Sequence, residues 1–292
     1  MLMATTKLAQ EVEVIPGDKI EIKGSDYQAK VELSFPNQRI VIKDYQGPNL
    51  EGLKDELIAS APKEITKIWI KARKQDEAAF QEIGFEKEAE IARFYPDDDA
   101  SLLAYYLSSN RKQQVNKEEK DEILASVRDL NNKEIKDLAQ NCEFKLATRD
   151  DLSDLADLYD DVFLTYPYPI NNPFFLRKMM NQGVIYGLVY QNKQLVAAAS
   201  AETVAEYKNA EMTDFATRPE ARGQGLASYI LAKLEQELKD RDYNCLYTIA
   251  RAKVYGINKI FSQAEYEYTG TLVKNCNIAG GLEDMNLWQK RI

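Results

Sequence analysis

Residues 213–240, TDFATRPEARGQGLASYILAKLEQELKD, have the pattern of a strand, a glycine-containing loop and a long amphipathic helix. Gly223 and Gly225 remove side chains from the loop, so its backbone can approach a bulky anion. The N-terminus of the helix adds unpaired amides and a partial positive charge, and Arg222 adds a full one. The stretch therefore predicts a pyrophosphate site. The apolar helix face that would orient it comprises Leu226, Ile230, Leu231, Leu234 and Leu238.

A glycine-containing loop before a helix is also compatible with a helix-capping turn and with a dinucleotide-binding domain. Glycines alone are also typical of a plain turn that caps a helix. A dinucleotide-binding domain would need GxGxxG early in a long series of strand and helix units. Ser228 stands where the third glycine would be, and too little chain follows to complete such a sheet. A dinucleotide-binding domain is therefore excluded.

The composition describes a globular protein of ordinary type. The chain has 292 residues and a mass of 33.4 kDa, which suffices for two domains. A formal net charge of −9 argues against a nucleic-acid partner, because phosphate binding needs a basic face. No N-terminal run has signal-peptide character, and no stretch approaches the roughly 20 apolar residues of a membrane span. We expect a cytoplasmic protein without a membrane partner.

Histidine is absent, which excludes imidazole bases, histidine-based metal sites and Ser-His or Cys-His nucleophile pairs. Cys142, Cys245 and Cys276 are far apart and odd in number, so neither a disulfide framework nor a zinc site is expected. Acid and base chemistry must therefore fall to Asp, Glu, Tyr or Lys, without a metal.

The loop fits the acetyl-CoA-binding pattern Q/R-x-x-G-x-G/A of the GNAT superfamily of N-acetyltransferases, through Arg222, Gly225 and Ala227. The resemblance extends to AEMTDFATRPEARGQGLA, YTIARA, residues 258–261, YEYTGTLVKNCNIAGG and EDMNLWQK. Together these stretches resemble the β-lysine N-acetyltransferases, which make the osmolyte Nε-acetyl-β-lysine. The resemblance covers most of residues 143–292 and, more weakly, the N-terminal part. It implies acetyl-CoA as cofactor and a small-molecule amine as partner.

An internal repeat indicates how the chain is organised. KIWIKARKQDEAAFQEIGFEKEAEIARF parallels CLYTIARAKVYGINKIFSQAEYEYTGTLVKN, although strand–helix–strand order also recurs by chance in α/β proteins. The first copy has QGPNLEG in place of ARGQGLA, without paired glycines. We expect an α/β protein with a GNAT acetyltransferase fold, a mixed central sheet flanked by helices, at residues 143–292. A degenerate GNAT-like domain without a coenzyme site, residues 1–110, and a charged helical connector, residues 111–142, precede it.

Periodicity predicts the individual elements. An N-terminal meander is expected from VEVI, KIEIK, KVELSF and RIVIKDY, then a helix at LEGLKDELIASA and a buried strand at KIWIKAR. The helix DEAAFQEIG and the strand FEKEAEIARFY follow. The connector has helical patches at KDEILASVRDL and KEIKDLAQ. In the second half, FKLAT leads into an amphipathic helix, FFLRKMMNQ forms another, and VIYGLVYQNKQLVAAASAETV forms a hairpin that turns at residues 191–194.

Acetylation of a lysine-like ammonium, whose pKa is about 10.4, requires a carboxylate that removes a proton directly or across a water. Glu211 is the first choice, because it precedes Arg222 by the same separation as the catalytic glutamate of histone-type GNAT enzymes. Asp214 and Glu202 compete with it, and either could instead bind a substrate ammonium. Strand alternation puts Glu211 and Asp214 on opposite faces. The bulge that the superfamily carries in this strand would re-aim them and free a backbone N–H for the thioester oxygen.

The sequence departs from its superfamily at two positions. Phe261 stands where the superfamily usually has a tyrosine that acts as general acid. Val254 stands where it usually has an asparagine that binds pantetheine. Asn258, one turn later, is expected to substitute for that asparagine. The open alternatives for the acid are Tyr255, Tyr266 and Tyr268, and Tyr268 is retained as a catalytic residue.

The resemblance also implies which residues contact the two substrates. The expected coenzyme contacts are Phe215, Ala216, Thr217, Arg222, Gly223, Gln224, Gly225, Leu226, Ala227, Ser228 and Asn258. The expected acceptor contacts are Tyr166, Tyr168, Glu202, Asp214, Asn275 and Asn277. In this scheme acidic groups orient a cation, and the asparagines take a carboxylate.

The expected function is acetyl-CoA-dependent acetylation of the terminal amine of a small diamino acid, with β-lysine first. Acetylation of another polyamine-like metabolite or of a protein lysine is the rival within the same class. A non-catalytic acetyl-CoA sensor is the rival of a different class, suggested by Phe261 in place of tyrosine. The sequence leaves a homodimer open.

Overall fold

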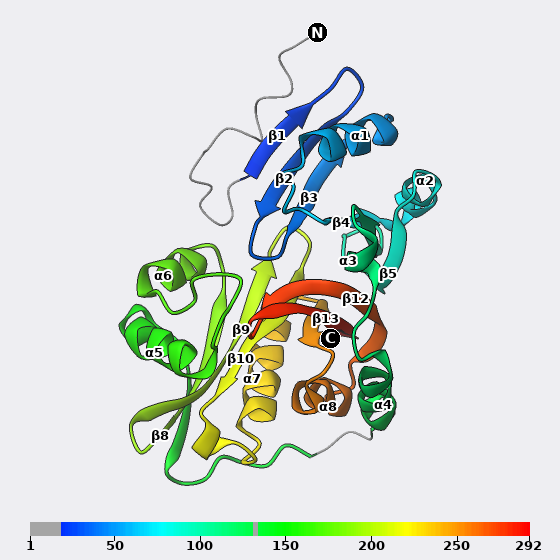
Figure 1. The fold of residues 1–292 in the computed structure, drawn as a ribbon. Coiled ribbons are helices and arrows are strands. Elements are labelled where there is room, and N and C mark those ends of the chain that lie inside the picture. The colour runs from blue at the N-terminus through cyan, green and yellow to red at the C-terminus, as the bar shows by residue number, and fades with distance from the viewer. Residues whose placement is uncertain (1–18, 131–133) are drawn as a thin grey trace.

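Two mixed β-sheets, one in each half of the chain, organise this computed structural model, which describes residues 19–130 and 134–292 (Figure 1). The N-terminal sheet contains β1 (Lys19–Lys23), β2 (Gln28–Ser34), β3 (Arg39–Gln46), β4 (Lys67–Arg73), β5 (Glu86–Ile91) and β6 (Ala100–Tyr106). The C-terminal sheet contains β7 (Cys142–Leu146), β8 (Ile185–Gln191), β9 (Gln194–Val204), β10 (Asn209–Thr217), β11 (Cys245–Arg251), β12 (Glu267–Ile278) and β13 (Gly281–Arg291). The helices are α1 (Leu50–Ser60), α2 (Glu77–Glu82), α3 (Ser109–Lys112), α4 (Lys117–Val127), α5 (Leu152–Val162), α6 (Pro173–Asn181), α7 (Leu226–Asp240) and α8 (Tyr255–Gln263).

The two sheets share one topology. Their strand orders are β1-β2-β3-β4-β6-β5 and β12-β13-β11-β10-β9-β8-β7. In the first, β3 and β4 are parallel between antiparallel neighbours, and β10 and β11 occupy the same place in the second. The helix that joins the parallel strands is α1 in one half and α7 in the other. The structure confirms a GNAT fold preceded by a GNAT-like half, and the exact domain boundaries stay predictions.

Most predicted elements lie where the sequence places them. The β8–β9 hairpin turns at Asn192 and Lys193, whose φ values of 51° and 69° are those of a tight turn. Strand β6, with the sequence ASLLAYY, is an element that the prediction lacked. The predicted helix KEIKDLAQ is wrong for its described residues, which are irregular and lie against α7 and α8, since so short a patch cannot nucleate a helix alone. The predicted strand VEVI lies outside the described residues.

Helix α7 packs its apolar face on the C-terminal sheet. The five residues of the predicted stripe are all buried and form one core with Met212 and Phe261. Helices α5 and α6 cover the opposite face, where Leu155 and Leu158 pack in a separate core (Figure 1). The loop that precedes α7 is thereby held at one end of the sheet.

The N-terminal sheet also has two different faces. Ile68 and Ile70 of β4 point to the side that α1 covers. Trp69, between them, points to the second half and shares a core with Tyr247 of β11 and Leu287 of β13. The two halves therefore have a common core, which fixes the N-terminal sheet against the second half.

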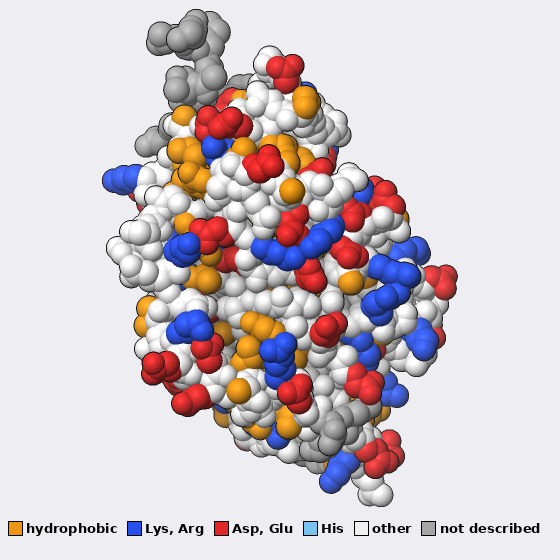
Figure 2. Space-filling model, turned by 90° about the vertical axis from the view of Figure 1, so that its right-hand side faces the viewer, with side chains coloured by type: hydrophobic (Ala, Val, Ile, Leu, Met, Phe, Trp, Pro, Cys, Tyr) orange, Lys and Arg blue, Asp and Glu red, His pale blue; other side chains and the backbone are white. Residues whose placement is uncertain are grey.

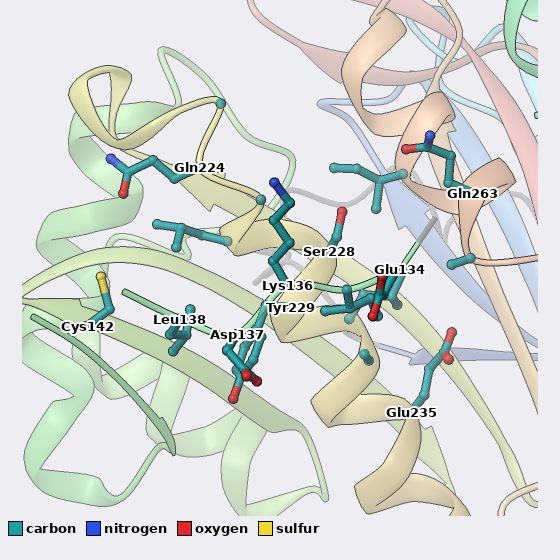
Figure 3. A pocket seen from close by; sticks show the side chains of 18 of the residues that line it. Glu134, Lys136, Asp137, Leu138, Cys142, Gln224, Ser228, Tyr229, Glu235 and Gln263 are labelled. Atoms are coloured by element: carbon teal, nitrogen blue, oxygen red, sulfur yellow. The ribbon is translucent and has the colours of Figure 1, made fainter. Parts of the chain in front are cut away.

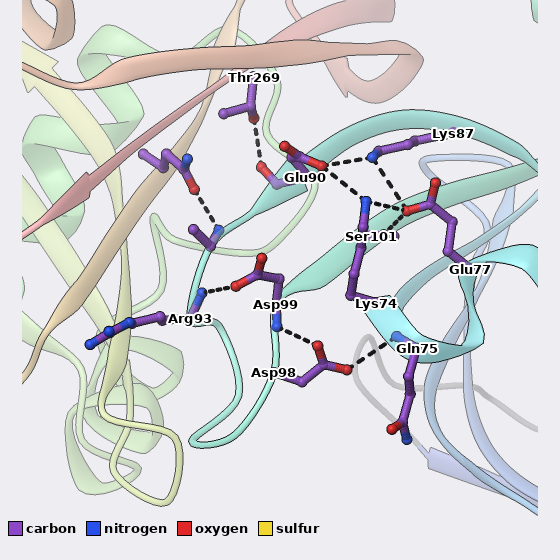
Figure 4. A network of polar contacts seen from close by, with 12 residues as sticks. Lys74, Gln75, Glu77, Lys87, Glu90, Arg93, Asp98, Asp99, Ser101 and Thr269 are labelled. Atoms are coloured by element: carbon purple, nitrogen blue, oxygen red, sulfur yellow. Dashed lines mark hydrogen bonds and ion pairs between the residues drawn. The ribbon is translucent and has the colours of Figure 1, made fainter.

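A strand-to-strand contact completes this junction. Strands β5 and β12 lie side by side, and Thr269 Oγ1 donates a hydrogen bond to the carbonyl of Glu90 at 2.6 Å (Figure 4). The Glu90 carboxylate pairs with Lys87 at 2.7 Å, within a polar network of the first half. A Cβ at Gly270 would lie 2.0 Å from the carbonyl oxygen of Glu88, so only glycine permits this close approach.

The surface carries mixed charge. On the face shown in Figure 2, Lys and Arg side chains are interspersed with Asp and Glu side chains. This face therefore lacks the continuous basic area that a nucleic-acid partner needs. Within residues 19–130 and 134–292, no helix combines the length and the apolar character required to cross a membrane.

Candidate functional site

The loop before α7 is open on its outer side. Gly223 and Gly225 both have φ of +80°, a left-handed conformation that glycine adopts without strain. A Cβ at either glycine would meet no atom within 4 Å. Gly225 is the residue directly before α7, so the unpaired first amides of the helix begin here. The loop has room for a bulky group beside its backbone.

A cavity of about 630 Å³ adjoins this loop (Figure 3). Ser228 and Tyr229 of α7 form one wall, Gln263 of α8 another, and residues 134–139 a third. The charged residues of this lining are two lysines, Lys136 and Lys290, and four acidic residues, Glu134, Asp137, Glu235 and Glu265. The volume lies within the range of about 300–1,000 Å³ that is typical of small-molecule sites.

Strands β10 and β11 separate beside the loop. The described pairing between them runs from Asn209 to Glu211, although β10 continues to Thr217. Backbone groups at this gap are free to pair with a ligand that has amide groups of its own. The predicted bulge is present, because the register of β10 against β9 shifts between Thr213 and Ala216.

These features fit the extended coenzyme that the loop pattern predicts. The open glycines and the start of α7 suit a pyrophosphate. The cavity is large enough for the nucleotide part of the coenzyme. The gap between β10 and β11 leaves backbone groups free to pair with the amide groups of its pantetheine part. Of the predicted coenzyme residues, the cavity is lined by Gly223, Gln224, Gly225, Leu226 and Ser228. Phe215 and Thr217 lie on β10 beyond its pairing with β11, Arg222 lies in the loop, and Ala227 lies in the first turn of α7.

Two predicted contacts are buried in the protein core. Ala216 packs on the α5 side of the sheet, and Leu226 is part of the α7 core. Leu226 also lines the cavity beside the loop, and its backbone amide lies in the first turn of α7. The expected coenzyme contacts of these two residues stay predictions.

Asn258 does not fit the predicted coenzyme contact either. It is fully buried, and its Nδ2 donates to the carbonyls of Arg251 at 2.9 Å and Val254 at 2.8 Å. Its Oδ1 accepts hydrogen bonds from Asn286 Nδ2 and Trp288 Nε1, both at 3.0 Å. Because every polar atom of the side chain has a partner, Asn258 joins α8 to β11 and β13 as a structural residue.

Asn258→Ala should therefore destabilise the fold by about 2–4 kcal/mol, because buried groups of three neighbouring elements lose their partner. Urea unfolding followed by circular dichroism measures the change. Gln263→Ala on the same helix is the matched control and should stay within about 0.5 kcal/mol of wild type. A variant with normal stability and weakened coenzyme binding would restore Asn258 as a coenzyme contact.

Two carboxylates lie opposite each other on the face of the C-terminal sheet that meets the first half. Glu211 of β10 is the register partner of Glu202 of β9. Lys71 of β4 extends from the N-terminal half, with its Nζ 3.8 Å from Glu211 Oε2 and 2.7 Å from the Tyr247 hydroxyl. The side chains of Lys71 and Glu211 are 21% and 20% exposed, so this pair is only partly buried.

Asp214 adds a third carboxylate from the bulge. It accepts hydrogen bonds from the hydroxyls of Tyr166 at 2.5 Å and Ser200 at 2.7 Å. Burial raises the pKa of Asp214, the two hydrogen bonds lower it, and the charge of Glu211 raises it again. Burial, Asp214 and Glu211 also raise the pKa of Glu202, against the effect of nearby lysines. The bulge thus brings all three predicted carboxylates into one cluster, where full ionisation of every member is unfavourable.

The structure supplies no tyrosine hydroxyl at the position of Phe261. Its ring is buried between Phe215 and Tyr266, with centroids 5.4 Å and 4.9 Å away. The hydroxyl of Tyr268 shares a hydrogen bond with Thr271 Oγ1 at 2.7 Å. The role of Tyr268 as general acid stays a prediction.

The other predicted acceptor residues all contact the N-terminal half. The Tyr168 hydroxyl donates to Glu32 Oε1 at 3.4 Å, and the backbone N–H of Asn277 donates to Asn37 Oδ1 at 2.8 Å. Asn275 is fully buried at the same junction. Residues of the first half therefore border the acceptor side of the site.

The sequence reading missed this contribution of the first half. Lys71 and Glu32 were not among the predicted site residues, because KIWIKAR was interpreted only as a buried strand. A signal was present, since alternation puts Lys67, Trp69 and Lys71 on one face of β4, away from the isoleucines. Charged residues on a face that is expected to be buried indicate a functional surface or a partner.

A family model matches part of the second half of the chain, and curated relatives match most of its length. The model of the "Acetyltransferase (GNAT) family" matches residues 150–258. Beta-lysine N(6)-acetyltransferase of Methanococcus maripaludis is 33% identical over 89% of this chain and 95% of its own length. The enzyme of that name from Methanosarcina mazei is 33% identical over 76% of this chain and 89% of its length. N-acetyltransferase YodP of Bacillus subtilis is 32% identical over 93% of this chain and 98% of its length.

Proposed function

The chain belongs to the β-lysine N-acetyltransferase family of the GNAT superfamily, and we propose that its own acceptor is the terminal amine of β-lysine. It is an N-acetyltransferase, and its acetyl donor is acetyl-CoA. The observation that supports this acceptor is the cluster of Glu202, Glu211 and Asp214 on a partly open face. Carboxylates in such a place suit a small molecule that carries two ammonium groups.

We propose that Glu211 is the general base. The acceptor amine must lose a proton before it can act as a nucleophile, and the Glu211 carboxylate lies at the open part of the cluster. Lys71 Nζ lies 3.8 Å from Glu211 Oε2, so the N-terminal half contacts the proposed base directly. Asp214 is held by Tyr166 and Ser200, which suits a residue that orients the substrate.

The loop and the start of α7 would hold the coenzyme, which supplies the acetyl group. Backbone amides from Gly223 to Ser228, together with Arg222, would bind its pyrophosphate. The bulge in β10 leaves backbone groups without a strand partner, and one of these N–H groups would donate to the thioester oxygen. The partly buried ring of Phe215, packed edge-on against the buried ring of Phe261, would exclude water from this end of the gap.

We further propose that the product, Nε-acetyl-β-lysine, serves as a compatible solute. Acetylation removes one of the two positive charges of β-lysine and leaves one ammonium and one carboxylate. The product has no net charge, as suits a solute that accumulates without a counterion. We propose no homodimer, because the fold and the relatives give it no support.

Competition among acceptors tests the proposal. Turnover with β-lysine should exceed that with α-lysine, and both should far exceed that with 6-aminohexanoate, because the acidic groups that pair the second amine would be left unsatisfied. Labelled acetyl-CoA is offered to a mixture of these three, an aminoglycoside and a lysine-containing peptide. Mass spectrometry then locates the acetyl group.

Two outcomes would contradict the proposal. Preferential labelling of the peptide, or of the β-amine of β-lysine, would replace the acceptor. Binding of acetyl-CoA without release of free thiol in the presence of any amine would favour the sensor, which the replacement of tyrosine by Phe261 suggests.

A further inference from the structure

Arg39 at the start of β3 is a buried cation without an acidic partner. The residue is 7% exposed, and no carboxylate of the described residues forms an ion pair with its guanidinium. Its Nη1 donates to the carbonyl of Asn275 at 2.8 Å, and its Nε has no hydrogen-bond acceptor in the described part of the chain. A buried charge is normally paired, so this arrangement requires an explanation.

The surroundings add to the positive charge. Lys67 and Arg111 are buried close by, and Glu88 is the carboxylate that pairs with Lys67, at 2.8 Å. Burial lowers the pKa of Lys67 to about 8, Glu88 opposes this shift, and the charges of Arg111 and Arg39 add to it. Burial and the charge of Arg39 lower the pKa of Arg111 to about 10. Three cations and one carboxylate therefore leave a local excess of positive charge.

Arg39 also borders the acceptor side of the site. Burial and Glu32 raise the pKa of Tyr168, whereas Arg39 lowers it, which places the guanidinium near this predicted acceptor residue. The guanidinium lies over the Trp69 ring, with its Cζ 5.1 Å from the ring centroid, which is a cation–π contact. Lys71, which contacts Glu211, lies two residues beyond Trp69 on the same face of β4.

We propose that Arg39 binds the carboxylate of the acceptor amino acid. The N-terminal half, which has no coenzyme loop, thereby forms the wall that distinguishes an amino acid from a simple diamine. This inference rests on the proposed β-lysine function. It also revises the expectation that Asn275 takes the carboxylate, because the Asn275 carbonyl faces Arg39 and its Oδ1 lies 3.3 Å from Lys67 Nζ. Asn275 instead positions the guanidinium.

The test compares β-lysine with its carboxamide, which keeps the shape of the molecule and removes the negative charge. Wild type should prefer β-lysine by about 10- to 100-fold in kcat/KM, as expected for a hydrogen bond between charged groups. Arg39→Gln should reduce this preference to within about 3-fold of unity, through a higher KM for β-lysine. Its kcat/KM for the carboxamide should stay within about 3-fold of wild type.

Arg73→Gln is the matched control, because Arg73 lies on the same sheet face but is more exposed and pairs with Asp97. It should keep the wild-type preference. Every variant is first checked for acetyl-CoA binding by calorimetry, which reports an intact second half. If Arg39→Gln fails this check, Arg39→Lys replaces it. Its preference for β-lysine over the carboxamide should fall several-fold, because lysine lacks the planar guanidinium whose two N–H groups can bind a carboxylate together.

The outcomes separate this inference from the function on which it rests. Equal losses for β-lysine and its carboxamide in the Arg39 variant would show a structural role and overturn the inference. A wild type that prefers the carboxamide would overturn it as well, with the β-lysine function intact. A wild type that acetylates neither compound, but does acetylate a peptide, would remove the proposed function itself.

Discussion

Glu211→Gln should lower kcat by about 10²- to 10⁴-fold near neutral pH, because the amide keeps the shape of the side chain and cannot accept a proton. Affinity for acetyl-CoA should change little, since Glu211 lies beside Lys71 on the acceptor face and not at the glycine loop. Steady-state rates at saturating acetyl-CoA and β-lysine measure the first quantity, and calorimetry measures the second.

The dependence of the rate on pH should also differ between wild type and Glu211→Gln. A terminal amine has a pKa of about 10.4, so its neutral fraction grows as pH rises, and the variant should regain part of its rate at high pH. In wild type, burial raises the pKa of Glu202 and Asp214, so these carboxyls take up protons at higher pH than exposed ones do. We expect the wild-type rate to fall on the acid side as the cluster is protonated. In Glu211→Gln this limb should move to lower pH, because the charge of Glu211 that raises the pKa of Glu202 and Asp214 is lost.

The neighbouring carboxylates provide matched controls. Glu202→Gln makes the same chemical change directly across the strand pair, and Asp214→Asn makes it at the bulge. If Glu202 and Asp214 only orient the substrate, both variants should lower kcat less than Glu211→Gln does. A larger loss in either variant would transfer the role of base to that residue, and a Glu211→Gln enzyme within a few-fold of wild type would exclude Glu211.

Local patterns in the sequence account for much of this fold. The apolar stripe from Leu226 to Leu238 predicts α7 and its buried face. The similarity of KIWIKAR to CLYTIAR predicts two sheets of one topology. These features depend on periods of 3.6 and 2 residues and on turn chemistry, which are local properties. The carboxylates at positions 202, 211 and 214 were also predicted to lie near the loop, and the structure brings them together.

The contribution of the first half could not be predicted in the same way. The contact between Lys71 and Glu211 and that between Arg39 and Asn275 join residues far apart in the chain, across the junction of two sheets. Such contacts depend on how the sheets pack, and periodicity indicates only that a charged face exists. Asn258 shows the converse error, because a motif assigned a ligand role to a side chain that the core uses fully.

The first half also shows why a shared topology does not imply a second coenzyme site. Where α7 follows the open loop, α1 begins within QGPNLEG, at Leu50, and its N-cap Asn49 accepts a hydrogen bond from the Gly52 amide at 2.8 Å. A Cβ at Gly47 would lie 2.3 Å from the carbonyl oxygen of Asp26. At Gly47 the chain itself therefore fills the space that stays open beside Gly223 and Gly225, and we expect one acetyl-CoA site per chain.

Arg222→Ala combined with Gly225→Val should weaken acetyl-CoA binding by at least about 100-fold, since a charge-assisted hydrogen bond and close backbone approach are lost together. The valine side chain would occupy the open space in front of the loop, and φ of +80° is strained for any residue with a Cβ. Calorimetry of wild type and variant measures both the affinity and the number of sites, which should be one per chain.

Gly280→Val separates the loss of the binding site from the cost of backbone strain. Gly280, between β12 and β13, has φ of +86° and also has no atom within 4 Å of a built Cβ, so the substitution imposes a similar strain away from the loop. Its acetyl-CoA affinity should equal that of wild type. If the control loses affinity as the loop variant does, the effect belongs to folding. Two sites per chain, or an unchanged affinity in the loop variant, would remove the coenzyme from this loop, because the open glycines are what distinguish it from the closed loop of the first half.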